Sequence, residues 1–238
     1  MIALVCSILI PILFFFLGQK SPNIKNDLSK IKKEENVNSN LKLSISDKKV
    51  QVLLMFAGVF CCIAMSMPQV HIVPLCIDNG FGLAVGTEIL SFMLFAAVTS
   101  RVLFGLLSDK IGPIQTLILG STLQAISLSM FLPFNSQISL YIVAICFGLS
   151  QGGIVPIYAV IISKFLPENE VAERVGLLIF ATIIGMSLGG WLSGLIYDYT
   201  NSYQMAFLNG IFWNLVNLSI MVYLFLKYQQ SIKRVVEI

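Results

Sequence analysis

Charge is what this sequence lacks most. Only 11% of its 238 residues are Asp, Glu, Lys or Arg, whereas soluble domains carry about a quarter. Apolar residues, in contrast, make up 57% of the chain. This balance excludes an ordinary soluble domain and indicates a membrane protein.

Motifs for metals, phosphates or nucleic acids are also missing. The five cysteines have no metal-ligand spacing and imply no disulfide framework. The sequence contains no phosphate-binding glycine loop with its lysine and no His-Glu-x-x-His motif. We therefore expect a protein that is not an enzyme and that has no cofactor, no metal and no nucleic-acid partner.

Long apolar runs are present instead. A membrane-spanning helix needs roughly 20 mostly apolar residues. The candidate spans are Ile2–Leu17, Gln51–Ile77, Gly86–Leu107, Ile114–Leu132, Ser139–Leu166, Val175–Ile196 and Ala206–Leu226. The first is the shortest, but it lacks the basic start and the small-residue end of a signal peptide. We expect an all-α membrane protein with about seven transmembrane helices in the lipid bilayer.

The basic residues predict which way the chain crosses the membrane. If the spans alternate, all of the 15 Lys and Arg residues except Arg101 fall on one side. The positive-inside rule makes that side cytoplasmic. We therefore expect an N-terminus outside and a cytoplasmic C-terminus.

These patterns divide the chain into four parts. We expect residues 1–18 to form a first transmembrane helix and residues 19–49 to form a cytoplasmic Lys-rich linker. Residues 50–227 form a six-helix unit with short connections, which can divide into three plus three helices. Residues 228–238 form a cytoplasmic tail.

One stretch combines a buried charge with a short polar turn. Ser100 and Arg101 precede Gly105, and residues 105–112 read Gly-x-Leu-Ser-Asp-Lys-x-Gly. This pattern resembles the cytoplasmic loop motif of the major facilitator superfamily, in its second-half copy. The form with the arginine is typical of monocarboxylate transporters and oxalate/formate-type antiporters. The resemblance covers residues 50–227.

The resemblance implies a secondary transporter that works by alternating access. A full member has twelve spans, so this chain would hold the last helix of a first half, the linker and the second half. We expect part of a complete carrier in a bacterial inner (plasma) membrane, with a separate N-terminal half as a candidate partner. The alternatives are a carrier of a neutral or cationic solute and a membrane subunit that does not transport.

Arg101 is the residue on which the expected substrate class depends. An arginine at the centre of a spanning helix costs about 2.5–3.5 kcal/mol on insertion scales. Ala97 and Gly105 lie one turn to either side, which places Arg101 on a face of small residues. We interpret it as a clamp for an organic anion such as a monocarboxylate. The alternative is a structural arginine bound to backbone carbonyls or to Asp109.

Two departures from the family pattern limit the coupling mechanism. Some monocarboxylate carriers have an Asp one turn before the arginine, where this chain has Ala97. Oxalate/formate-type relatives have a Lys in the sixth of these spans, and none occurs between Val175 and Asp198.

Four further polar residues are candidate substrate-binding groups. His71 lies between two prolines, which loosen a helix, and histidine can relay protons; the alternative is an ordinary interfacial histidine. Gln69 can line the same cavity. Gln151 and Tyr158 follow in the fifth span, where binding a solute and bonding between helices are equally supported.

The turn motif predicts a conformational latch. Its members are Gly105, Asp109, Lys110 and Gly112. The Asp109 carboxylate can cap the N-terminus of the sixth span, a position that the helix dipole favours for an anion. The alternative is a plain turn.

The sixth span is rich in glycine. Small residues four apart let helices approach closely in lipid. We expect Gly185, Gly189, Gly190 and Gly194 to serve helix packing.

Overall fold

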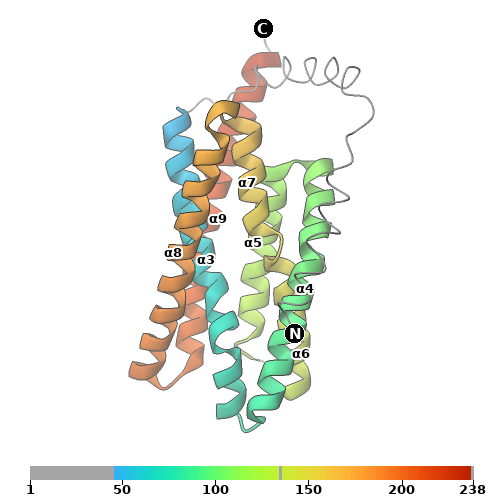
Figure 1. Cartoon of the computed structure of the whole chain (residues 1–238), viewed down its shortest axis with the longest axis vertical. Coiled ribbons are helices and arrows are strands. Elements are labelled where there is room, and N and C mark those ends of the chain that lie inside the picture. The colour runs from blue at the N-terminus through green and yellow to red at the C-terminus, as the bar shows by residue number, and fades with distance from the viewer. Residues whose placement is uncertain (1–45, 134–135, 237–238) are drawn as a thin grey trace, which may run out of the picture. The chain divides into compact units, whose positions relative to one another are not determined.

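The computed structural model describes residues 46–133 and 136–236 (Figure 1). The predicted first helix (1–18) and most of the predicted linker (19–49) lie outside the described residues. The chain divides into two units, Met1–Leu41 and Lys42–Ile238, and the described helices belong to the second.

The second unit is all-α, as predicted, with no strand in the described ranges. Its elements are α3 (Asp47–Asp78), α4 (Gly82–Ile111), α5 (Pro113–Met130), α6 (Gln137–Gln151), α7 (Ile154–Phe165), a 3₁₀ turn (Glu168–Glu170), α8 (Val171–Thr200) and α9 (Tyr203–Val236). Two helices extend into segments predicted as linker and tail. Residues 47–49 begin α3, and residues 228–236 continue α9.

The turns between the helices follow from local chemistry. Gly112 separates α4 from α5 with φ 93°, a backbone conformation that L side chains rarely adopt. Pro113 then occupies the first turn of α5, where its missing N–H costs nothing. Asn201 ends α8 with φ 50°, in the left-handed region that asparagine tolerates better than most residues.

Within the described part, 5 helical segments are long and apolar enough to cross a membrane. They are α3, α4, the α6–α7 pair, α8 and α9. Helix α5 fills the remaining predicted span but is shorter, with 18 residues. It buries polar side chains such as Thr116, Ser121 and Gln124, which lower its hydropathy.

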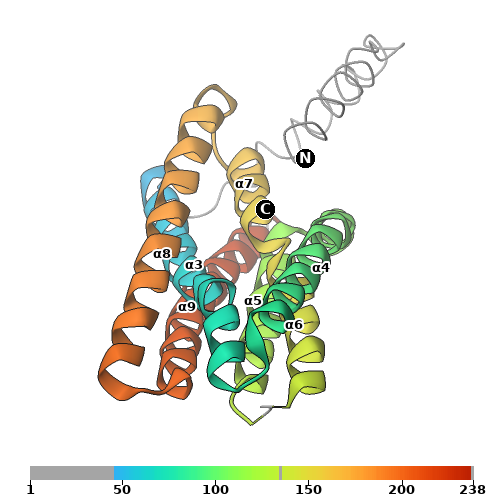
Figure 2. The same ribbon diagram turned by 60° about the horizontal axis from the view of Figure 1, so that its bottom comes forward.

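Within Lys42–Ile238, the helices form two three-helix units that pack across each other. The first three-helix unit is α3, α4 and α5, and the second is α6–α7, α8 and α9. Helix α3 packs mainly against α8 and α9, whereas α6–α7 packs mainly against α4 and α5. Helices α5 and α9 also pack on each other (Figures 1 and 2). The first helix of each unit therefore packs against the other two helices of the opposite unit.

Helices α4 and α8 flank this bundle, as Figure 2 shows. Each presents exposed large apolar side chains. They include Phe95, Val98, Val102 and Leu106 on α4 and Phe180, Ile183 and Trp191 on α8. These faces can contact lipid or another protein.

Two apolar clusters make up the core. One contains Leu54, Leu117 and Ile161, toward the end of the bundle where α4 meets α5. The other contains Ile72, Ile89 and Phe147, toward the opposite end. Buried polar residues lie between the clusters along several helices, and they form the setting of the candidate site.

Candidate functional site

A layer of buried polar side chains crosses the middle of the bundle, and we call it the middle layer. Along its own span, each member lies between residues of the two apolar clusters, with α6 and α7 counted as one span. The layer comprises Ser100 on α4, Ser121 and Gln124 on α5, Gln151 on α6, and Asn214 and Asn217 on α9. Polar groups at this depth are costly unless they are paired or functional.

Arg101 follows the Ser100 member of this layer directly. Its side chain is exposed, and it makes no hydrogen bond or ion pair with any residue that the structure describes. Ala97 and Ser108 are buried in helix packing, whereas Gly105 is exposed with open space around it. The expected face of small residues is therefore split, and only Gly105 shares the open side with Arg101. The guanidinium is available to a ligand or to another protein surface.

The fifth predicted span is broken near its middle. The continuous span expected from Ser139 to Leu166 is two helices, α6 and α7, separated at Gly152 and Gly153. Pro156 contributes to the break because it has no N–H to donate to the carbonyl of Gly152. Gln151 is the last residue of α6 and lies at this break.

Gln69 and Gln151 meet across α3 and α6. The Gln69 side-chain amide donates to Oε1 of Gln151 at 3.1 Å. Gln151 is only 1% exposed, and its Nε2 has no hydrogen-bond partner among the described residues. An unpaired buried donor costs about 1–3 kcal/mol, so this amide is a candidate for binding a solute oxygen.

His71 lies apart from this pair, on the far side of α3 from Gln151. Its Nε2 is 3.1 Å from the carbonyl oxygen of Gly190 on α8. Its ring also lies near Tyr203, with centroids 6.0 Å apart. In this arrangement His71 bridges α3 to α8.

Tyr158 is bonded inside the bundle. Its hydroxyl donates to Oδ1 of Asn217 at 2.7 Å, and the Asn217 amide donates to Ser121 Oγ at 2.9 Å. All three side chains are fully buried. This geometry supports a bond between helices, which was one of the two roles that the sequence left open.

The latch residues lie at the end of α4, but the predicted cap does not form in this structure. Asp109 and Lys110 are exposed and make no hydrogen bond or ion pair with the described part of α8. At the start of α8, Arg174 forms an ion pair with Glu170 at 2.5 Å. The Arg174 carbonyl accepts from the Gln51 amide at 3.1 Å. The latch stays a prediction for another conformation of the protein.

The glycines of α8 differ in how closely they pack. A Cβ at Gly185 or Gly189 would overlap the α3 backbone at Val59 or Ile63. Gly190 and Gly194 have only ordinary contacts with α3 side chains.

The equivalent close crossing of α4 and α6 was not predicted. There, a Cβ at Gly148 or Gly152 would overlap the backbone of Met93 or Ala97. The spacing of four between these two glycines was the available signal. Ser121 and Gln124 were also missed, although their spacing of three places them on one face of α5.

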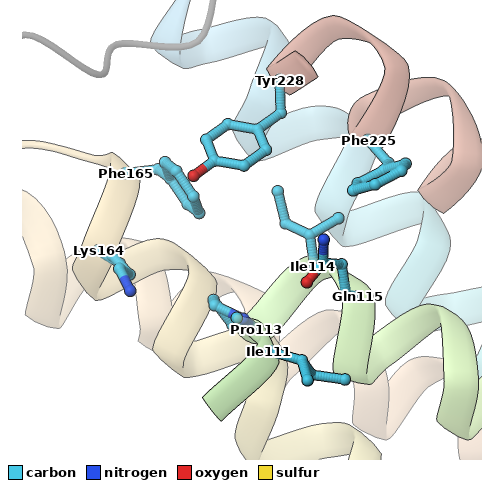
Figure 3. A pocket seen from close by; sticks show the side chains of 9 residues that line it. Ile111, Pro113, Ile114, Gln115, Lys164, Phe165, Phe225 and Tyr228 are labelled. Atoms are coloured by element: carbon cyan, nitrogen blue, oxygen red, sulfur yellow. The ribbon is translucent and has the colours of Figure 1, made fainter. Parts of the chain in front are cut away.

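Three cavities lie away from this layer. One of about 200 Å³ lies near the α4–α5 turn, where Lys164, Gln115 and Tyr228 share the lining with apolar side chains (Figure 3). A second, of about 330 Å³, includes Asp78 and Tyr197, whose hydroxyl donates to that carboxylate at 2.5 Å. The third, of about 520 Å³, is a mostly apolar groove between α8 and α9. None of the predicted substrate-binding residues lines these three cavities.

Comparison with known proteins gives the family. The sequence profile described as Major Facilitator Superfamily matches residues 54–236. Monocarboxylate transporter 13 of Rattus norvegicus is 28% identical over 143 residues, which cover 59% of this chain and 33% of that protein. The MFS-type transporter opdF of Penicillium oxalicum is 29% identical over 157 residues, covering 63% of this chain and 37% of that protein. An uncharacterized MFS-type transporter of Escherichia coli, YhjX, is 25% identical over 92 residues, covering 38% and 23%.

The chain spans about a third of the length of the first two of these relatives. Their names describe transporters rather than enzymes, and the profile match covers nearly the whole described helical bundle. The helical bundle and its apolar spans fit the family that the profile match identifies. The chain belongs to the major facilitator superfamily.

Proposed function

We propose that this chain carries a small organic anion, most specifically a monocarboxylate, across the membrane by alternating access. The observation that carries the proposal is Arg101. It is a permanent cation within a spanning helix, it lies on an exposed face, and it has no partner among the described residues. The name of monocarboxylate transporter 13, a relative over the matched region, supports the same class of solute.

The charge of Arg101 is costly within a spanning helix. A charged side chain at bilayer depth faces a bundle interior or a watery cavity far more often than lipid. A guanidinium offers a planar fork of donors that fits both oxygens of a carboxylate. Arg101 therefore supplies what a small anion requires, and the unpaired Gln151 amide can supply a further donor in the same layer.

We propose that a second six-helix half completes the pathway. The chain spans about a third of its relatives' length, and the exposed apolar faces of α4 and α8 remain open in the described bundle. Alternating access requires two halves that rock about a site between them. A surface that packs against α4 and α8 would enclose Arg101 in such a site.

We also propose a plasma-membrane location with a cytoplasmic C-terminus. Lys110, Lys164 and Arg174 share one end of the bundle if the spans alternate, and the positive-inside rule makes that end cytoplasmic. The relatives come from mammals, a fungus and a bacterium. The proposal therefore extends the expected bacterial inner membrane to the plasma membrane of any host cell.

The test is uptake of labelled lactate, pyruvate and formate by cells that express the chain from its native locus, so that every natural partner is present. Arg101→Gln should reduce uptake of the transported anion about tenfold or more, because charged hydrogen bonds contribute about 1.5–3 kcal/mol. Arg101→Lys should retain part of the activity. Lys164→Gln, which removes an exposed cytoplasmic charge, is the matched control.

Two results would contradict the proposal. Unchanged uptake in Arg101→Gln at equal membrane abundance would dismiss the anion clamp. No difference in uptake of any of the three anions between wild type and a strain lacking the chain would dismiss the substrate class, and would favour a neutral or cationic solute or a subunit without transport.

A further inference from the structure

We propose that Ser100 is a positioning residue for the solute site: its hydroxyl holds open the α6–α7 break that places Gln151 in the layer of Arg101. This inference rests on the function proposed above for Arg101 and Gln151. It adds a residue to which neither the sequence motif nor the comparisons assign a role.

The Ser100 hydroxyl is inserted between two backbone groups at the α6–α7 break. Ser100 Oγ donates to the carbonyl oxygen of Leu149 at 2.6 Å and accepts from the Gly153 N–H at 3.2 Å. Residues 149 and 153 are four apart, so in a continuous α-helix they would bond to each other. The Ser100 hydroxyl occupies the place of that bond, and an inserted side chain of this kind is a recognised cause of helix breaks.

Other hydroxyls in the bundle behave differently. Ser129, Ser187 and Ser219 each donate to the carbonyl four residues earlier on their own helix, at 2.8–3.0 Å. Ser100 instead donates across to α6, although the same local bond is available in principle on α4. Its position therefore serves the contact between the helices.

The surrounding glycines make room for this contact. A Cβ at Gly152 would overlap the Ala97 backbone, and one at Gly153 would overlap the Phe104 side chain. Ser100 lies between Ala97 and Phe104 on α4 and is fully buried, at 0% exposure. Because Gly152 and Gly153 carry no side chain, the α4 backbone approaches α6–α7 closely enough for the Ser100 hydroxyl to reach their backbone hydrogen-bonding groups.

The two Ser100 bonds also fix the position of Gln151. Ser100 bonds to residues 149 and 153, which lie on either side of Gln151. The bonds fix the backbone from which Gln151 meets Gln69 at 3.1 Å and keeps its Nε2 without a partner among the described residues. Because Arg101 is the next residue on α4, the same contact sets the level of the guanidinium relative to the Gln151 amide.

The functional test is uptake kinetics in Ser100→Ala, measured for the anion that the Arg101 experiment identifies and in the same native-locus setting. We expect KM to rise about tenfold, the equivalent of one misplaced hydrogen bond, with less change in the maximal rate per transporter in the membrane. Ser100→Thr, which keeps the hydroxyl, should recover part of the affinity. Ser129→Ala removes a serine of ordinary local bonding and should leave KM unchanged.

A structural readout is independent of transport. Hydrogen–deuterium exchange of peptides that contain the Gly153 amide should differ between Ser100→Ala and wild type, since that amide loses its acceptor, and should not differ for Ser129→Ala. Unchanged exchange would overturn the inserted-hydroxyl role. Changed exchange with unchanged KM would overturn the positioning role, while the Arg101 variants decide the proposed function separately.

Discussion

Tyr158 on α7 and Asn217 on α9 are joined by a hydrogen bond of 2.7 Å between two fully buried side chains. Ser121 on α5 completes the group by accepting from the Asn217 amide. Three helices from both three-helix units thus meet in one polar contact. The stability of the bundle should therefore depend on each member of this group.

Removing the Tyr158 hydroxyl should destabilise the bundle. Tyr158→Phe leaves Oδ1 of Asn217 buried without its donor, which should lower the free energy of unfolding by about 1–3 kcal/mol. Thermal unfolding of the purified chain in nanodiscs measures the effect. Tyr223→Phe, at an exposed tyrosine of α9, is the control and should change little. A Tyr158→Phe protein of wild-type stability that binds solute less tightly would instead favour the substrate-binding role.

Replacing Asn214 and Asn217 by leucine should have different effects on the stability of the bundle. Helices α5 and α9 run antiparallel, so the Ser121–Asn217 contact places Gln124 at the level of Asn214. Neither polar atom of Asn214 has a partner among the described residues, and Gln124 Nε2 also lacks one there. Asn214→Leu should therefore leave stability unchanged or raise it, because it removes an unpaired buried amide.

Asn217→Leu should lower the free energy of unfolding by about 1–3 kcal/mol. It removes both the acceptor of the Tyr158 hydroxyl and the donor to Ser121. Chemical unfolding of both variants in the same detergent gives the comparison. Equal destabilisation by the two substitutions would show that the Asn214 amide is paired, with Gln124 as the nearest candidate at its level, and would contradict the prediction.

The close crossing of α3 and α8 should not tolerate a methyl group. A Cβ at Gly189 meets the Ile63 backbone and Ser66 Oγ, so Gly189→Ala should cost about 1–3 kcal/mol through overpacking. Gly176 lies on the same helix, and a Cβ there would meet nothing within 4 Å. Gly176→Ala should be neutral or stabilising by about 0.5–1 kcal/mol. Similar melting temperatures for the two alanine variants would refute the close crossing.

The stability of the turn that ends α8 should depend on whether residue 201 tolerates a left-handed backbone conformation. Asn201 adopts φ 50° and ψ 32°. Asn201→Gly should be tolerated, whereas Asn201→Val should cost about 1–2 kcal/mol because a branched side chain disfavours the left-handed region. The two melting curves, recorded side by side, test this. A valine variant as stable as the glycine variant would mean that the turn adopts another conformation in the membrane.

Much of the helical architecture could be predicted from the sequence. Apolar runs locate helices because the bilayer requires their length and composition. The break in the fifth span was not predicted, although Gly152, Gly153 and Pro156 are visible in the sequence. Arg101 could also be recognised from the sequence, because a charge within an apolar run is visible without coordinates.

Pairings between helices could not be predicted in this way. The sequence treats the four glycines of α8 alike, yet only Gly185 and Gly189 lie against the α3 backbone. It also predicts an Asp109 cap on α8, whereas Asp109 makes no hydrogen bond with the described part of α8 in this structure. Each of these outcomes depends on the rotation and distance of a neighbouring helix, which residue spacing on one helix does not define.

The helical spans, their apolar character and the motif around Arg101 are readable from the residues alone, since hydrophobicity and local motifs are properties of single segments. The packed bundle is needed to see that Ser100 donates to the Leu149 carbonyl of α6 and that Tyr158 donates to Asn217 of α9. The physical reason is that a hydrogen bond between helices requires donor and acceptor to lie within a narrow range of distances and angles, and those positions arise from the packing of the whole bundle.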